Sequence, residues 1–291
     1  MEKVSLYVPC YNGEDTIREC LESILYQSYK IDEILLINDA SLDKTVEIAA
    51  QFPIRIITHE KNKGLAACRN AALKEAKNDF IVSLDADCVA DREWLKELMG
   101  CFRDDSIAGA GGMLREKYAF KTADKWRAIH MAQHWGNGLL ENPPFLYGSN
   151  TVFRRTAIEK VNFYNENFRS NYEDVDLSMR IYSEGLNLVY NPRARVEHLK
   201  QDTINSVLGS YRKWFYYRHA NITRVNQFSR RLAMCFGRIG EYLDICSGFS
   251  REDLSSGNHN LLLLDFMLPF YCIWSELKES LRILFSLLNG A

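Results

Sequence analysis

Short apolar runs alternate with amphipathic segments in the N-terminal part of the chain, and this alternation predicts strands and helices in turn. The apolar runs predict strands at residues 4–8, 33–38, 54–58 and 80–84. Apolar residues at helical spacing predict helices at residues 17–25, 44–51 and 65–77. A repeat of this kind is typical of an α/β protein with a doubly wound, mostly parallel sheet and right-handed connections.

The pattern becomes less regular after residue 91. Helices are expected at residues 93–102, 122–135 and 174–183, and strands at residues 146–153 and 187–196. The glycines within residues 109–112 are interpreted as a flexible turn. Because the composition changes near Gln201 and the remainder has a helical pattern, we expect an α/β domain at residues 1–201 and a helical C-terminal extension at residues 202–291.

Two acidic residues, Asp85 and Asp87, directly follow the apolar run of residues 80–84. Ligands of open α/β sheets bind beyond the C-terminal ends of the strands. In an extended chain, residues two apart point the same way, so both carboxylates share one site if the strand continues that far. The two acids repel each other, and Mg2+ or Mn2+ bridged to a phosphate would supply the compensating charge. The alternative is a polar turn with ordinary surface acids.

The loops that follow the other early strands also carry polar side chains. Tyr11 and Asn12 follow the first strand, Asp39 follows the second, and residues 62–64 follow the third. These loops are expected to meet at one edge of the sheet, where they could hold a nucleotide. Tyr11 could stack on a base, Asp39 could accept from a base N–H, and Arg69 could bind a diphosphate. A buried aromatic residue is the alternative interpretation of Tyr11.

The composition narrows the classes of function. The chain has 291 residues, of which 47% are hydrophobic and 25% charged, as in globular proteins. A formal net charge of -2 argues against a nucleic-acid binder. The eight cysteines include no Cys-x-x-Cys pair, which argues against a structural zinc site and fits a reducing compartment. The first residues run into a strand pattern, so no signal peptide is expected and the expected location is cytoplasmic.

Taken together, these motifs resemble those of glycosyltransferase family 2, which has the nucleotide-sugar transferase fold called GT-A. The matching segments are residues 8–12, 37–41, 62–64 with 69–70, 85–87, 148–150, and 173–177 with Arg180. The resemblance covers about residues 4–198 and implies a GT-A type mixed sheet flanked by helices. Asn38 departs from the family pattern, which commonly has an aspartate at this position.

The resemblance implies how the donor is bound. Tyr11 and Asp39 would contact the base, with Asp39 accepting the uracil-type N–H. Arg69 would lie near the diphosphate, and Asp85 would hold the ribose or sugar hydroxyls. The donor-binding residues implied are Pro9, Tyr11, Asn12, Asp39, Gly64, Arg69 and Asp85.

The resemblance also implies the metal and acceptor sides of the site. Asp87 would bind the divalent metal, and His198 is a further candidate ligand, although a lone histidine after a strand is often structural. Asp174 would be the catalytic base, with a simple helix cap as the alternative. The acceptor-side candidates are Glu173, Gly148, Ser149 and Asn150. A helix N-terminus favours ionised Asp174, so a low pKa and a weak base are expected there.

The function implied is an inverting, metal-dependent glycosyltransferase of the hexosyltransferase type. It would move a sugar from a nucleoside-diphosphate sugar to a hydroxyl of a glycan or a lipid-linked saccharide. Asp39 favours UDP, while dTDP and GDP stay open. One alternative is a haloacid-dehalogenase-type phosphatase, because residues 85–89 match Asp-x-Asp-x-Thr/Val with Asp85 as nucleophile. The other is a non-catalytic relative that binds a nucleotide sugar.

The C-terminal part has two interpretations. Residues 203–240 contain no acidic residue, and basic and aromatic residues alternate within residues 211–238. They form either helices that pack on the catalytic domain, or a peripheral contact with anionic lipid or a lipid-linked acceptor on the cytoplasmic face of a membrane. No membrane span is expected, because residues 261–274 are interrupted by Asp265 and Pro269.

Overall fold

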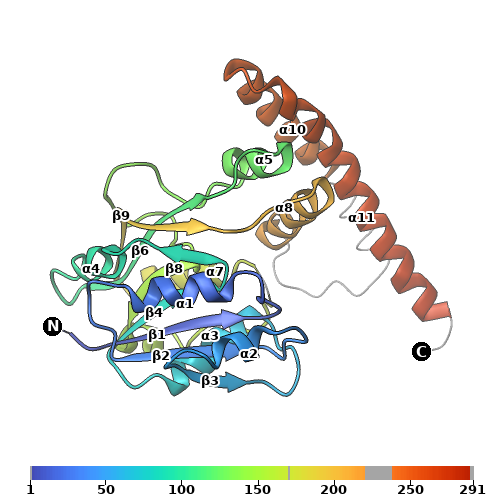
Figure 1. Ribbon diagram of the computed structural model, residues 1–291. Coiled ribbons are helices and arrows are strands. Elements are labelled where there is room, and N and C mark those ends of the chain that lie inside the picture. The colour runs from blue at the N-terminus through green and yellow to red at the C-terminus, as the bar shows by residue number, and fades with distance from the viewer. Residues whose placement is uncertain (1, 170, 220–237, 289–291) are drawn as a thin grey trace. The chain divides into compact units, whose positions relative to one another are not determined.

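The computed structural model describes residues 2–169, 171–219 and 238–288 (Figure 1). The chain divides into two compact units, of which the first comprises residues 1–117 and 132–200 and the second residues 118–131 and 201–291. The division into domains at residues 1–201 and 202–291 stays a prediction. Within the compact units, residues 118–131 group with the C-terminal helices, although they precede them by some 70 residues.

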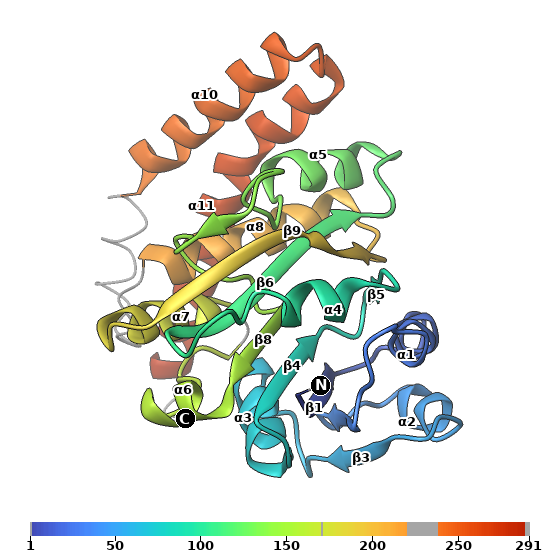
Figure 2. The ribbon, with the colours of Figure 1, turned by 90° about the vertical axis from the view of Figure 1, so that its left-hand side faces the viewer.

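The first unit is built on one mixed sheet (Figure 2). Its strands are β1 (Val4–Cys10), β2 (Glu33–Asn38), β3 (Arg55–Thr58), β4 (Phe80–Leu84), β5 (Cys88–Ala90), β6 (Ile107–Glu116), β7 (Leu140–Glu141), β8 (Asn150–Arg154) and β9 (Asn187–His198). Their order is β3-β2-β1-β4-β8-β6-β9-β5, with β7 paired to β9. The first four strands are parallel, and β8 runs antiparallel to both β4 and β6. The predicted mixed α/β sheet is therefore confirmed.

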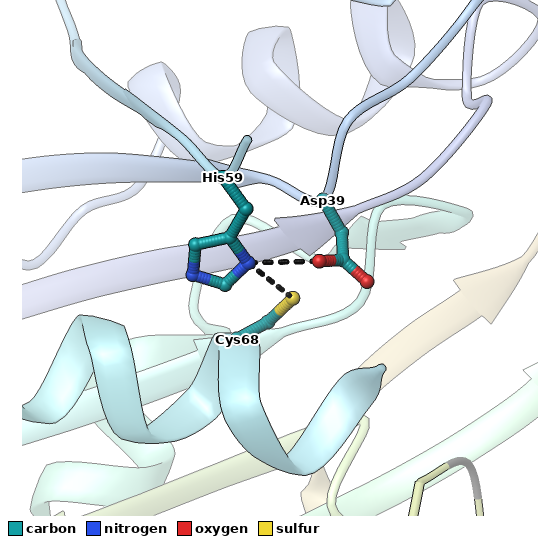
Figure 3. Close-up of side chains that lie close together, drawn as sticks. All are labelled: Asp39, His59 and Cys68. Carbon is teal, nitrogen blue, oxygen red and sulfur yellow. Dashed lines mark hydrogen bonds and ion pairs between the residues drawn. The ribbon is translucent and has the colours of Figure 1, made fainter. Parts of the chain in front are cut away.

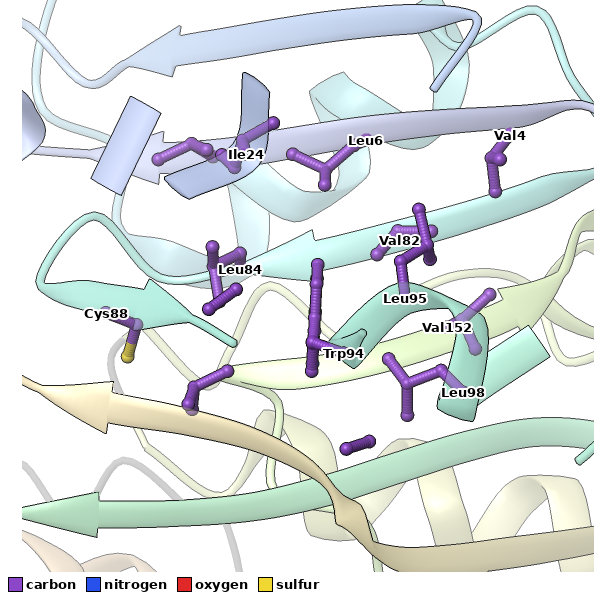
Figure 4. Packing of buried hydrophobic residues seen from close by; sticks show 14 of the residues in the cluster. Val4, Leu6, Ile24, Val82, Leu84, Cys88, Trp94, Leu95, Leu98 and Val152 are labelled. Atoms are coloured by element: carbon purple, nitrogen blue, oxygen red, sulfur yellow. The ribbon is translucent and has the colours of Figure 1, made fainter. Parts of the chain in front are cut away.

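Helices cover both faces of this sheet. They are α1 (Ile17–Leu25), α2 (Thr45–Ala49), α3 (Leu65–Glu75), α4 (Trp94–Met99), α6 (Arg155–Lys160) and α7 (Glu173–Ser183). Leu6 of β1 belongs to the apolar layer formed with α1 and α4, around Trp94 (Figure 4). Its neighbour Tyr7 belongs to the opposite layer, formed with α3, α6 and α7. Strands buried on both faces explain the continuous apolar runs in the sequence.

The glycines of residues 109–112 were expected in a turn, and this expectation is wrong. They lie inside β6, which pairs with β8 and β9. A Cβ at Gly109 would collide with the Phe153 ring, and a Cβ at Gly112 would collide with the backbone of Ala194. The glycines therefore let β6 approach its neighbours closely, which is a common reason for glycine within a strand.

The second unit is helical, as predicted for the C-terminal part. It contains α5 (Thr122–His130), α8 (Ile204–His219), α10 (Ile239–Ser255), the short 3-10 helix η1 (His259–Leu261) and α11 (Leu262–Leu288). Trp126 of α5 packs in one apolar cluster with Phe215, Tyr242 and Leu264. Helix α5 thus shares a core with helices from the C-terminal part, which sequence periodicity does not reveal.

Helix α11 continues through Asp265 and Pro269, the two residues that interrupt the apolar run of residues 261–274. Asp265 is buried and accepts a hydrogen bond from Trp126 Nε1 at 2.8 Å. Among the described residues, the window His259–Arg282 is long and apolar enough to cross a membrane by length and composition, and 39% of it is buried. One such helix is weak evidence for a span, because the core helix of a folded domain meets the same criteria.

Candidate active site

His198 lies between two carboxylates at the point where β6 and β9 end and β5 begins. His198 ends β9, where it lies opposite Cys88 of β5 and Glu116 of β6 in the strand register. Its Nε2 lies 3.1 Å from Asp87 Oδ2, and its Nδ1 lies 2.8 Å from Glu116 Oε2. The pairing of these strands therefore brings together two predicted metal ligands, Asp87 and His198. Glu116 was not predicted, because its strand was not recognised in the sequence.

The charges of His198, Asp87 and Glu116 stabilise one another. Burial lowers the pKa of His198, but the charges and hydrogen bonds of Asp87 and Glu116 outweigh burial and raise it to about 9. Burial acts to raise the pKa of Asp87, but His198 outweighs it and holds that pKa below its usual value. The side chain of Asp87 is 39% exposed, so a cation can reach its ionised carboxylate.

The two acids of the Asp85-Ala86-Asp87 motif face different partners. Strand β4 ends at Leu84, and the Cys88 N–H donates to the Asp85 carbonyl at 3.0 Å, which closes a turn. The condition for a shared extended conformation is therefore not met, and Asp85 contacts Arg69 at 3.3 Å while Asp87 contacts His198. Burial raises the pKa of Asp85, and Arg69 opposes this rise.

Arg69 connects the elements of the site from the buried face of α3. Its side chain is 1% exposed, and it donates to Ser83 Oγ at 3.2 Å and to the Gly148 carbonyl. Its Nε lies 3.7 Å from Glu173 Oε1. Protein groups surround the guanidinium, and the predicted position of Arg69 near a diphosphate stays a prediction. Arg69 is thus placed to neutralise the surrounding carboxylates.

Glycine is required at position 148 because Arg69 lies so close. A Cβ at Gly148 would meet Nη1 of Arg69 at 2.6 Å. The Gly148 N–H donates to Asp174 Oδ2 at 3.0 Å, so the same residue contacts both the cation and the predicted base. This position was predicted on the acceptor side, and the structure places it directly beside Asp174.

Helix α7 begins with the acidic pair Glu173 and Asp174. Tyr172, which precedes them, has a left-handed backbone with φ of 75°, a conformation that is strained for a bulky residue and frequent at functional sites. Burial raises the pKa of both acids, while Arg69 opposes the rise. The expectation of a low pKa for Asp174 from the helix N-terminus is therefore wrong, because burial outweighs the helix dipole.

Asp39 lies beside His59 and near Cys68 (Figure 3), and its carboxylate also holds the loop that follows β3. Its carboxylate accepts from the backbone N–H groups of Lys63 and Gly64, both at 2.8 Å, and His59 Nδ1 lies 2.8 Å from it. Burial acts to raise the pKa of Asp39, but these hydrogen bonds outweigh it and hold the pKa below its usual value. The nearby Cys68 Sγ lies 4.0 Å from His59 Nδ1, and burial raises the pKa of this thiol.

The residues after β1 lie at the same edge of the sheet. Tyr11 is 49% exposed, so it is available for stacking and is not the buried aromatic of the alternative interpretation. Asn12 Oδ1 accepts from the Leu42 N–H at 2.8 Å, which connects the loops after β1 and β2. Pro9 is buried within β1 and pairs with Ile37, so it supports the loop that follows β1.

Two acceptor-side candidates have contacts inside the protein. Ser149 donates to Gln133 Oε1 at 3.1 Å, and its carbonyl accepts from the Asp85 N–H. Asn150 is buried, and its Oδ1 accepts from Trp94 Nε1 at 2.6 Å. The amide of Asn150 therefore connects β8 to α4, while its backbone pairs with Leu84, directly before Asp85.

Known proteins share this fold and sequence pattern. The model of the family "Glycosyl transferase family 2" matches residues 5–161. EpsE of Bacillus subtilis (strain 168), which is named as a glycosyltransferase, is 30% identical over 80% of this chain and 84% of its own length. The poly-beta-1,6-N-acetyl-D-glucosamine synthase of Staphylococcus epidermidis is 27% identical over 74% of this chain. The chain spans only 54% of that synthase.

Solved structures show the same fold at low sequence identity. A crystal structure of GalNAc-T7 with UDP, GalNAc and Mn2+ has a TM-score of 0.58 and 16% identity, and it covers 69% of this chain and 44% of its own. TarS of S. aureus, residues 1-349, has a TM-score of 0.56 and 16% identity, covering 77% and 74% respectively. The fold is therefore GT-A-like, as the motifs predicted.

The fold and the site define a sugar-transferring enzyme. The chain belongs to glycosyltransferase family 2, which confirms the resemblance that its motifs carry.

Replacing Arg69 by methionine should lower the free energy of unfolding by about 3–5 kcal/mol, because it leaves buried carboxylates without a counter-charge. Urea unfolding followed by circular dichroism measures this loss. The matched control is Arg55→Met, which removes an arginine that is 45% exposed and paired with Glu75, and it should cost at most about 1 kcal/mol. Equal losses for the two variants would show that Arg69 does not have this role.

Stability of the metal-free protein should fall between pH 6.5 and 9 because of His198. Its folded pKa of about 9 exceeds its ordinary value, so its contribution is complete below pH 6.5 and is lost as pH rises through 9. The loss should be up to about 3 kcal/mol. Urea unfolding in EDTA across this range should show a smaller loss for His198→Gln, whereas His259→Gln, at an exposed position, should behave as the wild type.

Proposed function

We propose that this glycosyltransferase transfers a sugar from a UDP-sugar to a hydroxyl of a glycan or a lipid-linked saccharide, with inversion and with a divalent metal ion. The proposal rests on one observation, the placement of acids with different tasks at one edge of the sheet. Asp174 and Asp87 are both near enough to Asp85 for their charges to raise its pKa, so the three acids belong to one group.

The donor side is supported by the loops after the first strands. Tyr11 offers an exposed ring for a base, and Asp39 shapes the loop that contains Gly64. Two structural neighbours were solved with related donors or products, GalNAc-T7 with UDP and TarS with UDP-GlcNAc. The synthase of S. epidermidis is named for a polymer of N-acetylglucosamine. These relatives make UDP-N-acetylhexosamines the first donors to test.

A divalent cation fits the group formed by Asp87, His198 and Glu116. Asp87 is ionised and accessible, and Glu116 can keep the Nδ1 proton of a neutral His198, which leaves Nε2 available as a ligand. Carboxylate and imidazole are suitable donors for Mn2+. When bound, the ion would neutralise the negative charge of the nucleoside diphosphate as it leaves.

Asp174 is proposed as the base that accepts the proton of the acceptor hydroxyl. The acceptor oxygen then forms a bond to the anomeric carbon on the face opposite the leaving diphosphate, and this direct displacement inverts the configuration. Burial raises the pKa of Asp174, which makes it a better base than an ordinary aspartate. The Gly148 N–H holds one oxygen of the carboxylate, and Arg69 limits the rise in pKa.

The phosphatase alternative loses its support. Family membership assigns the chain to glycosyltransferases, and the Asp85 carboxylate contacts a buried arginine. A cytoplasmic location and a peripheral membrane contact stay predictions. Residues 220–237 of the predicted contact segment lie outside the described residues. Exposed Phe270 and Trp274 on α11 offer apolar side chains that would support a contact with lipid.

Substituting Asp174 by asparagine should leave donor affinity nearly unchanged and lower turnover roughly 10^2–10^4-fold, because the base acts only on the acceptor. Asp87→Ala should instead weaken Mn2+-dependent donor binding. Thermal shift with UDP-GlcNAc and UDP-GalNAc, with and without Mn2+, measures binding, and UDP release with water as acceptor measures turnover.

The control for this experiment is Asp176→Asn, in the same first turn of α7. Asp176 forms an ion pair with Arg180 on the same helix. Because such a pair contributes about 1 kcal/mol or less to stability, Asp176→Asn should keep turnover close to that of the wild type. Transfer at the wild-type rate by Asp174→Asn would disprove the assignment of the base. A similar loss of turnover in both single variants, Asp174→Asn and Asp176→Asn, would indicate damage to the helix instead.

Exchanging Glu116 for glutamine should weaken Mn2+ binding roughly 10–100-fold, because the carboxylate orients His198 and holds its proton. Isothermal titration of Mn2+ into the full chain with UDP present measures this change. Glu19→Gln, which removes an exposed carboxylate that contacts Lys117, should leave the affinity unchanged. An unaltered affinity in Glu116→Gln would mean that His198 is not a ligand or does not need this support.

A further inference from the structure

A second group of titratable side chains lies in the helical unit, separate from the candidate active site. It consists of His130 at the end of α5, Asp253 on α10 and Asp265 on α11, and all three side chains are 0% exposed. His130 Nε2 lies 3.0 Å from Asp253 Oδ2 and 4.0 Å from Asp265 Oδ1. One potential ligand atom from each residue lies within 4.8 Å of the others.

The hydrogen bonds of this group are incomplete within the described part of the chain. Asp253 Oδ1, Asp265 Oδ2 and His130 Nδ1 are buried there without a hydrogen-bond partner. Trp126 Nε1 donates to the other oxygen of Asp265 at 2.8 Å. Buried polar atoms in folded proteins are nearly always paired, so several unpaired atoms on three adjacent side chains indicate a missing partner.

The surroundings make uncompensated charge unfavourable here. The ring of His130 lies 4.1 Å from the Phe249 ring and 5.1 Å from the Trp126 ring, measured between centroids. Burial raises the pKa of Asp265, and the nearby Asp253 charge adds to this rise, although Trp126, His130 and the nearby Ser250 hydroxyl oppose it. Two carboxylates with an imidazolium carry a net charge of -1, whereas two carboxylates, a neutral imidazole and a divalent cation carry none.

We propose that His130, Asp253 and Asp265 bind a divalent metal ion, with Zn2+ as the best-suited ion, and that this ion joins α5, α10 and α11. One imidazole nitrogen and carboxylate oxygens form a donor set that Zn2+ accepts, and no cysteine ligand is needed. Glu252, whose Oε2 lies 3.8 Å from His130 Nδ1, is placed to hold the second ring nitrogen. None of these residues belongs to the proposed sugar-transfer site.

Metal content tests this proposal in the full chain, prepared without a tag and treated with EDTA. The Asp87→Ala background removes the metal ligand of the candidate active site, so that the other site can be counted alone. After incubation with Zn2+ and desalting, this protein should retain about one Zn2+ per chain, and its Tm should rise. Adding Asp253→Asn should lower Zn2+ affinity at least about tenfold and abolish the rise in Tm.

Asp244→Asn is the matched control, because Asp244 is an exposed acid on the same helix and its loss should leave one Zn2+ bound. Zn2+ retained equally with and without Asp253→Asn would place the ion elsewhere, for example at Asp39, His59 and Cys68, and would overturn the proposal.

A spectroscopic measurement needs no change within the cluster, so it remains informative if Asp253→Asn fails to fold. Co2+ added to the Asp87→Ala protein should give visible absorption bands of a protein-bound ion, and one equivalent of Zn2+ should remove them. Absence of both Zn2+ uptake and Co2+ bands would show that the cluster is metal-free, with one carboxyl protonated. These outcomes do not depend on whether the protein transfers sugar.

Discussion

A buried guanidinium makes it possible for several carboxylates to lie together at one edge of the sheet. Arg69 contacts Asp85 and Glu173 and moderates the pKa of Asp174. Without Arg69, burial would raise the pKa values of these carboxyls further, since charge in a poorly solvated interior is costly. Helix α3 can carry this cation inward because small residues such as Ala66 and Ala72 on its buried face leave room against the sheet.

The same cation determines how the chain is arranged around the proposed base. Gly148 accepts a hydrogen bond from Arg69 with its carbonyl and donates one to Asp174 with its N–H. The position of the base therefore depends on the guanidinium through one residue that has no side chain. Tyr172, which directly precedes α7, has a left-handed backbone. Local backbone strain therefore occurs next to the two acids that begin the helix.

Local sequence patterns were sufficient to predict the first four strands and the loops that follow them, whereas the family resemblance suggested Asp87 and His198 as ligands of one metal ion. The local patterns failed where the role of a residue depends on its neighbours on adjacent strands. Gly109 and Gly112 belong to a strand because Phe153 and Ala194 come close, and no pattern near the glycines reveals those neighbours. Glu116 was missed with that strand. The pKa of Asp174 was misjudged because the helix dipole is visible in sequence whereas burial is not.

The electrostatics of Asp87 and Asp174 fit the different tasks that we propose for these two acids. Asp87 is held ionised by His198, which suits a group that must attract a cation at all times. Asp174 is buried and more basic, which suits a group that must take up a proton during each turnover. The turn at Ala86 directs Asp85 to Arg69 and Asp87 to His198, so the carboxylates remain on different partners. A continuous strand would have placed both acids on one side and left no means of tuning them separately.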